Sequence, residues 1–136
     1  MTSPTTCDAL KQIARDFLRS LNDPKQVNLG FEKARNLATD DVSVTHDSYP
    51  STNGIGAFLS GWAKAKQFMP KFDMEIIDMV AEVDAGGAGG RVWVFSKISG
   101  GKGGEERDSV DMMCIDATGK ISKSKDVQRV TVTGEV

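Results

Sequence analysis

The sequence predicts an α+β domain in which three helices pack on one face of a mostly antiparallel sheet. In the first half of the chain, apolar residues recur at the three- and four-residue spacing of amphipathic helices. From Lys71 onward they alternate with a period of two, as in strands, and glycine-rich turns separate the runs. A chain of 136 residues has the length of one domain, so we expect residues 1–136 to form a single unit.

The first two helices are predicted from their apolar stripes and their boundaries. Thr5 or Thr6 is placed to cap a first helix, which the Asn-Asp-Pro sequence at residues 22–24 ends. The apolar positions of this helix are Leu10, Ile13, Ala14, Phe17, Leu18 and Leu21. After a polar link, a shorter helix is expected at about residues 30–38.

A strand and a third helix follow. Residues 42–46 alternate valine with serine and threonine and end at His46, which predicts a strand. Thr52 or Asn53 is expected to cap the third helix, which the Met-Pro pair at residues 69–70 ends. Its stripe consists of Ile55, Phe58, Leu59, Trp62, Ala63 and Lys66.

The rest of the chain predicts an antiparallel meander that closes in a hairpin. Its strands are expected at residues 72–83, 91–99, 107–115 and 121–132. Between the last two, Gly119 supplies the positive φ of a short polar turn. Both parities of these strands carry apolar residues, which predicts a sheet that is covered on both faces. Because the helices can cover one face, we expect a homodimer through the outer face.

Composition argues against several classes of partner. Seventeen Lys and Arg residues against 19 Asp and Glu residues give a net charge of -2, which does not favour nucleic acid or an anionic membrane surface. The start of the chain does not read as a signal peptide, and nowhere do about 18 apolar residues occur in succession. Cys7 and Cys114 belong to no metal-binding pattern, and two reduced thiols predict a cytoplasmic protein.

Asp111 is an unusual residue because it lies in the middle of a predicted strand. Aspartate is a poor strand former, and it cannot enter a core in the ionised form without a partner. Its neighbours of the same parity are Ser109, Met113 and Ile115. We interpret this mostly apolar row as the wall of a pocket. The alternative is a solvated position, or a pair with Arg91 or Arg107.

The closing hairpin, SVDMMCIDATGKI at residues 109–121, and the order of the predicted elements together resemble the NTF2-like, SnoaL-like superfamily. Within it the hairpin is most similar to ketosteroid isomerase, which has an aspartate before an apolar strand and then an Asp-x-x-Gly-Lys/Arg turn. The resemblance implies a cone-shaped domain with a curved sheet. Many members are polyketide cyclases, dehydratases or isomerases, and others are binding or dimerisation modules.

The resemblance also implies roles for single residues. Asp111 falls where the isomerases place a protonated aspartic acid that donates a hydrogen bond to a developing enolate. Residues 40–46 resemble the family's Asp-Asp-x-x-Val-x-Asp strand, with His46 in place of the aspartate that moves the proton. Where the family has an oxyanion tyrosine on the first helix, this chain has Asp16 and Phe17.

The protonation state of Asp111 has two alternatives. Burial among apolar side chains would raise its pKa and keep it a neutral donor, whereas a position within reach of His46 would favour an ionised aspartate beside a protonated histidine. Asp126 or Asp16 is expected to supply a second acid, although Asp126 also fits a solvated edge strand. The expected substrate-binding residues are Phe17, Tyr49, Phe58, Trp62, Val94, Met113 and Gln128.

The resemblance, together with these residues, implies a cofactor-independent isomerase, cyclase or dehydratase of a natural-product pathway. It would act by general acid–base catalysis on a hydrophobic polyketide- or terpenoid-like small molecule, with His46, Asp111 and Asp126 as its catalytic residues. One histidine and scattered carboxylates predict no metal site. The alternative is a non-catalytic module of the same fold that binds a small molecule or dimerises.

Overall fold

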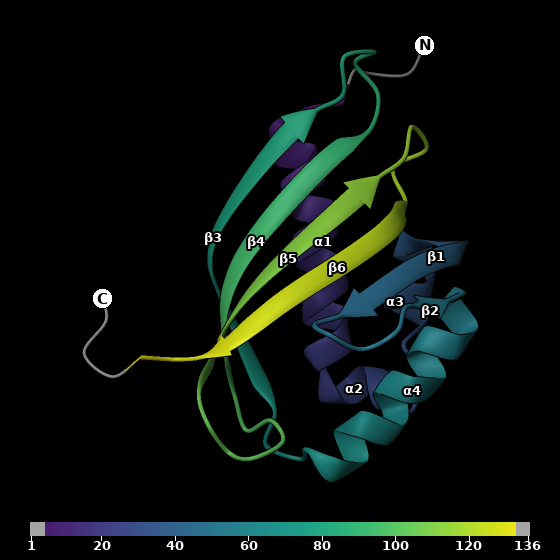
Figure 1. Cartoon of the computed structure of the whole chain (residues 1–136). Coiled ribbons are helices and arrows are strands. Elements are labelled where there is room, and N and C mark those ends of the chain that lie inside the picture. The colour runs from purple at the N-terminus through teal and green to yellow at the C-terminus, as the bar shows by residue number, and fades with distance from the viewer. Residues whose placement is uncertain (1–4, 133–136) are drawn as a thin grey trace.

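A computed structural model of the chain describes residues 5–132 and confirms the predicted α+β class. Six strands form one curved sheet in the order β2-β1-β6-β5-β4-β3, and the helices pack on one of its faces (Figure 1). The strands are β1 (Ala38–His46), β2 (Thr52–Asn53), β3 (Asp73–Val83), β4 (Gly90–Ser99), β5 (Arg107–Ile115) and β6 (Ile121–Val130). The helices are α1 (Cys7–Asn22), α2 (Pro24–Val27), α3 (Glu32–Leu37) and α4 (Ile55–Phe68).

The helix boundaries follow from local capping. Thr6 caps α1 by accepting the backbone N–H of Ala9 at 3.1 Å, as expected. Asp23 then caps the single turn of α2 through the N–H of Lys25, and the sequence analysis missed this turn. The predicted cap of α4 was wrong: Gly54, with φ of 97°, precedes the helix, and residues 52–53 form β2 instead.

The strand pairing joins β1, from the first half of the chain, to β6, the last strand. Strands β3 to β6 form the expected antiparallel meander, and Gly119 has the expected positive φ in the last turn. Strand β1 begins four residues earlier than predicted, at Ala38, and pairs in parallel with β6. This pairing places His46, at the end of β1, directly opposite Asp126 of β6.

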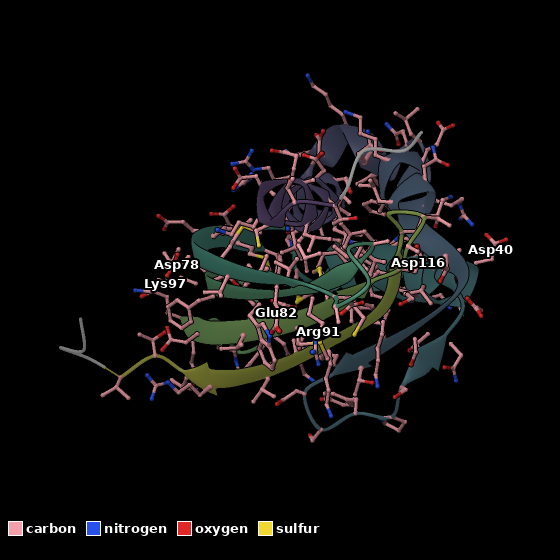
Figure 2. All side chains as sticks on the ribbon, turned by 90° about the horizontal axis from the view of Figure 1, so that it is seen from above. Asp40, Asp78, Glu82, Arg91, Lys97 and Asp116 are labelled. Carbon is pink, nitrogen blue, oxygen red and sulfur yellow. The ribbon has the colours of Figure 1, made fainter. Side chains whose placement is uncertain are left out.

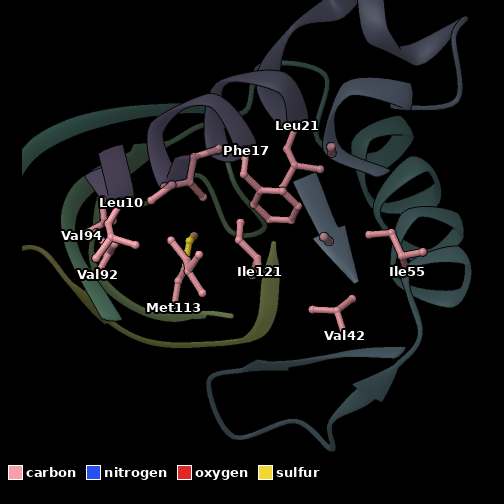
Figure 3. Close-up of a cluster of buried hydrophobic side chains, with 14 of the residues drawn as sticks. Leu10, Phe17, Leu21, Val42, Ile55, Val92, Val94, Met113 and Ile121 are labelled. Carbon is pink, nitrogen blue, oxygen red and sulfur yellow. The ribbon is translucent and has the colours of Figure 1, made fainter. Parts of the chain in front are cut away.

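The hydrophobic core lies between α1 and the inner face of the sheet (Figure 3). Leu10 of α1 packs over the part of β4 that carries Val92 and Val94. Phe17, two helical turns after Leu10 on α1, is 2% exposed and lies near Leu21. Each such buried side chain contributes about 1.5–3 kcal/mol to folding relative to its exposed state. The core continues beyond α1 to Val42 of β1 and Ile55 of α4.

The outer face of the sheet carries large apolar side chains that face solvent. Trp93 is 50% exposed, Val80 is 62% exposed and Val127 is 61% exposed. Viewed along its edge in Figure 2, the sheet has the helices on one side and leaves the other side uncovered. Among residues 5–132, no helix has the length and apolar character needed to cross a membrane.

Candidate active site

Three ionisable residues lie in one row across the inner face of the sheet. His46 of β1 is opposite Asp126 of β6, and Asp126 is in turn opposite Asp111 of β5. The next position in the row is Val94 of β4, which is fully buried. Neighbouring strands lie about 4.8 Å apart, so side chains of such a row that share a face lie close together. The sheet register therefore assembles these groups from three strands.

His46 and Asp126 form a hydrogen-bonded pair. Nδ1 of His46 lies 2.8 Å from Oδ1 and 2.9 Å from Oδ2 of Asp126. The side chain of His46 is 51% exposed and that of Asp126 is 18% exposed. A carboxylate accepts hydrogen bonds, so Nδ1 carries the proton in this pair and Nε2 is left as the nitrogen that can exchange a proton with a ligand.

Asp47 holds the carboxylate of this pair in place. Its backbone N–H donates to Oδ1 of Asp126 at 2.9 Å and to the main-chain oxygen of Asp126 at 3.0 Å. Asp47 has φ of 47°, in the left-handed region, where aspartate is more frequent than most residues. The chain therefore turns sharply just after His46, and this turn directs an amide at Asp126.

Asp111 lies in a very different environment, on the floor of the site. It is 5% exposed, and Oγ of Ser109 donates a hydrogen bond to its Oδ2 at 3.4 Å. Ser109 is itself 1% exposed. No ion pair of Asp111 is present among the described residues, so its charge would be buried without a cation in contact.

The pKa values of the two proton-carrying groups shift for different reasons. Burial, followed by the negative charge of Asp126, raises the pKa of Asp111 to about 7. The hydrogen bond to Asp126 raises the pKa of His46 above its usual 6.5, against the opposing effect of burial. Near pH 7 the site therefore combines a carboxyl that can keep its proton with a histidine that can gain or lose one.

These groups open into a cavity of about 710 Å³, a size typical of small-molecule sites. Its apolar walls come mainly from the second half of α1, from α4, and from the start of β3. The rings of Phe17 and Phe58 stack with centroids 6.3 Å apart, and Trp62 donates its indole N–H to the carbonyl of Leu21 at 2.8 Å. Tyr49 stacks on the imidazole of His46 with centroids 5.7 Å apart.

The structure brings most of the predicted site residues together. Those that line the cavity are His46, Asp111, Asp126, Phe17, Tyr49, Phe58, Trp62 and Gln128. Val94 and Met113 are corrections: both are fully buried in the core and neither lines the cavity. They have the strand parity of Asp111, but they lie where side chains of the core already cover the sheet.

The role expected for a second acid also needs correction. Asp126 accepts hydrogen bonds from His46 and from the N–H of Asp47, so it acts as the partner of the histidine. Asp16 is exposed on α1, is bonded to Gln12, and does not line the cavity. Of the two alternatives for Asp111, burial favours the neutral donor, because the hydrogen bond of His46 goes to Asp126.

Two other residues of the cavity had no role predicted from the sequence. Asp47 follows His46 directly, and its left-handed backbone lets its amide reach Asp126. A single aspartate in the sequence does not reveal this conformation. Arg107 was considered as a partner of Asp111, but its ion pair in the described structure is with Glu105. Within residues 5–132, no group of three or more His, Cys, Asp or Glu residues is arranged to hold a metal ion.

Comparison with known proteins gives two relatives of similar length, while no family model matches the chain. The chain is 29% identical to the probable cyclase otaY of Aspergillus carbonarius over 136 residues, which is 100% of both chains. It is 30% identical to the probable cyclase otaY of Aspergillus niger over 123 residues, which is 90% of this chain and 94% of that one.

Solved structures share the fold at low sequence identity. A SnoaL-like protein of unknown function from Burkholderia thailandensis has a TM-score of 0.70 and 15% identity, covering 93% of this chain and 99% of that one. The epoxide hydrolase/cyclase-like enzyme SalBIII, described as acting in pyran ring formation in the polyether salinomycin, has a TM-score of 0.55 and 14% identity, covering 90% and 95%. The Orange Carotenoid Protein of Anabaena, binding canthaxanthin, has a TM-score of 0.69 and 15% identity, covering 93% and 38%.

Proposed function

The chain belongs to the SnoaL-like, NTF2-like superfamily and, within it, to the family of the probable cyclases otaY, and we propose that it is itself a cyclase or isomerase of natural-product biosynthesis. It would act without a cofactor, by general acid–base catalysis, on a hydrophobic polyketide-like small molecule. The observation that carries this proposal is the placement of the His46–Asp126 pair and the buried Asp111 in one cavity.

The proposed reaction begins with enolisation of a ketone. Nε2 of neutral His46 removes a proton from the carbon next to a carbonyl, while Asp126 stabilises the imidazolium that forms. The protonated carboxyl of Asp111 donates its proton to the carbonyl oxygen, so the product of this step is an enol. The enol carbon then bonds to the carbon of a second carbonyl group in the same molecule. The oxygen of this second carbonyl takes the proton from His46. Asp111 regains its proton as the first carbonyl reforms.

The cavity supports a hydrophobic substrate. Its aromatic wall, formed by Phe17, Phe58 and Trp62, suits planar rings or an extended apolar chain. The volume of about 710 Å³ leaves room for a molecule of several rings. The names of the relatives and of SalBIII describe ring-forming enzymes, which agrees with cyclisation as the reaction class.

The proton-transfer step can be tested with a panel of hydrophobic ketones led by 2-tetralone. We would follow solvent deuterium exchange at their α-carbons by ¹H NMR in D₂O. The wild type should accelerate this exchange, and His46→Gln and Asp111→Ala should each slow it by about 100- to 10,000-fold. Lys123→Gln, at an exposed position on β6, is the matched control and should leave the rate unchanged. Full activity of both site variants would contradict the proposed catalysis. The alternative function, a non-catalytic binding module of the same fold, would then remain.

We further propose that two copies of the chain pack through the outer face of the sheet. The centre of this face is apolar and carries Trp93, Phe95 and Val110, which are 50%, 40% and 39% exposed. On this face β3 carries Asp73, Glu75, Asp78 and Glu82, and Arg91 and Lys97 of β4 lie opposite Glu82 and Glu75. Strand β6 carries Lys123, Lys125 and Arg129, so an acidic excess lies at β3 and a basic excess at β6. Figure 2 shows Glu82 of β3 next to Arg91 of β4, as their pairing requires.

This segregation of charge favours one symmetry of the dimer. A twofold axis parallel to the strands lays β3 of one copy over β6 of the other, so opposite charges meet. An axis across the strands would lay β3 on β3 and bring acidic residues together. In sedimentation experiments we expect the wild type to be a dimer and Trp93→Lys a monomer. Phe68→Lys, at a residue of α4 that is 86% exposed, should remain a dimer, and a wild-type monomer would contradict the proposal.

A further inference from the structure

The charged side chains that line the cavity fall into two separate groups. One group is the acid–base site described above. The other lies where the loop between β4 and β5 meets β5, and it contains Lys102, Glu105 and Arg107. Nothing in the proposed acid–base chemistry uses this second group, although it lines the same cavity.

Arg107 is the member of this group that the sheet holds in place. It lies on β5 with the same parity as Ser109 and Asp111, so it belongs to the inner face of the sheet. Its partners across the sheet are Ile98 of β4, which is 2% exposed, and Val130 of β6. The side chain of Arg107 itself is 33% exposed. A guanidinium is therefore held in a mostly apolar part of the cavity wall.

The ion pair of Arg107 leaves most of its donors available. The contact with Oε2 of Glu105 is 4.0 Å long, at the outer limit for an ion pair, and Glu105 is 57% exposed in a glycine-rich loop. Such exposed pairs contribute little free energy. A guanidinium has five N–H donors in a planar fork that matches a carboxylate, so a carboxylate in the cavity would form a better pair than Glu105 does.

The spacing along β5 relates this cation to the acid–base site. Arg107 and Asp111 are four residues apart on one strand, so their Cα atoms lie about 13 Å apart. A molecule with its carbonyl at Asp111 and an anionic group at Arg107 would therefore cross most of the cavity. Between the two points the sheet carries Ser109 with Gln128 opposite it, and the walls from α1 and α4 are apolar, so this stretch carries no charge and suits an uncharged body.

We propose that Arg107 is a specificity-determining residue, and that the substrate is an amphiphilic carboxylic acid whose carboxylate binds Arg107 while its apolar body lies along the cavity. Lys102, on the loop above it, adds a second positive charge near the same end. The inference rests on the proposed function for the reacting end of the substrate, but the recognition of the acid end can be measured without any reaction.

The test compares a hydrophobic acid with its uncharged ester. The probes are 4-(1-pyrenyl)butyrate and its methyl ester, and their binding is followed by pyrene fluorescence. The wild type should bind the acid at least tenfold more tightly than the ester at low salt. Arg107→Gln should weaken binding of the acid about tenfold and leave the ester unchanged. Added salt should weaken binding of the acid and leave binding of the ester unchanged.

Two further variants keep the result interpretable. Arg91→Gln makes the same change of charge on the outer face, where Arg91 is exposed, and should bind both probes as the wild type does. Arg107→Lys keeps the charge without the planar fork and should fall between the wild type and Arg107→Gln. Unchanged affinity for the ester shows that each variant is folded.

Equal affinity of the wild type for the acid and the ester would overturn the inference. So would equal effects of Arg107→Gln and Arg91→Gln on binding of the acid. Neither result would contradict the acid–base proposal, because the ketones of the exchange assay are uncharged and carry no anionic group for Arg107. Conversely, a wild type that does not accelerate exchange but still binds the acid more tightly than the ester would contradict the proposed function alone.

Discussion

The floor and the rim of the cavity hold two aspartates that lie opposite each other on neighbouring strands. They differ in their exposure and in their hydrogen-bond partners. Asp111, on the floor, is 5% exposed and has a serine hydroxyl as its hydrogen-bond partner. Asp126, on the rim, bonds to His46 and to the backbone of Asp47. Burial suits Asp111 to keep a proton, whereas Asp126 is the hydrogen-bond acceptor for two neighbouring residues.

This difference shows how one pair of identical side chains can supply two chemical roles. The charge of Asp126 raises the pKa of Asp111 as well as that of His46, so the ionised member makes its neighbour a better acid donor at neutral pH. We therefore expect substitutions at the floor and at the rim to have different effects.

The largest effect is expected from substitutions of the floor residue on the exchange rate of the ketone probe. Asp111→Ala should lower it by about 100- to 10,000-fold, because no donor is left for the carbonyl oxygen. Asp111→Asn keeps a neutral N–H donor, so its exchange rate should be at least tenfold higher than that of Asp111→Ala. The rate of the wild type should fall above pH 7, as Asp111 ionises, and the rate of Asp111→Asn should lack this fall.

A different ranking of the two variants would contradict the role of Asp111 as a neutral donor. If Asp111→Asn were as inactive as Asp111→Ala, and the wild-type rate rose above pH 7, the ionised form of Asp111 would be the active one. The fold of both variants can be checked from binding of the pyrene ester.

A smaller effect is expected on stability. The pKa of Asp111 is about 7 in the folded protein and near 3.8 when unfolded, so the folded state binds this proton more tightly. The resulting stabilisation is complete below about pH 4 and is lost as the pH rises through 7. Relative to the wild type, Asp111→Asn should therefore gain free energy of unfolding between pH 5 and pH 8, by at most about 3 kcal/mol.

Urea unfolding at the two pH values measures this change. Glu82→Gln, which removes a carboxylate from the exposed end of β3, is the control and should show a much smaller gain. The same gain in both variants would mean that net charge, and not the burial of Asp111, sets the pH dependence.

The smallest effect is expected on the titration of His46, the only histidine of the chain. Its imidazole signals in an NMR titration should give a pKa above 6.5 in the wild type. Asp126→Asn should lower this pKa to 6.5 or below, because burial then acts without the hydrogen bond. Asp111→Asn should lower it much less, since the charge of Asp111 is the weakest of the causes. An unchanged pKa in Asp126→Asn would contradict the pairing.

Local sequence signals predicted most of the fold. The helical stripe of α1, the Thr6 cap and the alternating runs of the meander are short-range patterns, and the structure confirms them. The single turn of α2 was missed because four residues are too few to show a helical period. The start of α4 was misplaced because Gly54, without a side chain to cap the helix, gives no capping signal.

The candidate site was predicted less completely, because strand parity says which face a residue occupies and not what covers it. Asp111, Val94 and Met113 share the inner face, yet the core covers Val94 and Met113 fully. The partner of His46 depends on a parallel pairing between β1 and β6, which no local pattern reveals. Parity correctly placed Asp126 on the inner face but could not identify His46 as its partner.

The parallel pairing of β1 with β6 also has a consequence for how the protein folds. His46 and Asp126 are 80 residues apart in the chain, and the strand that carries Asp126 is the last to be made. Contacts of such long range form late, because the loop between them must first be closed. We therefore expect the helices and the meander to collapse before the pair exists. The titration of His46 would then report the completion of folding, since no nascent chain that ends before residue 126 contains its partner.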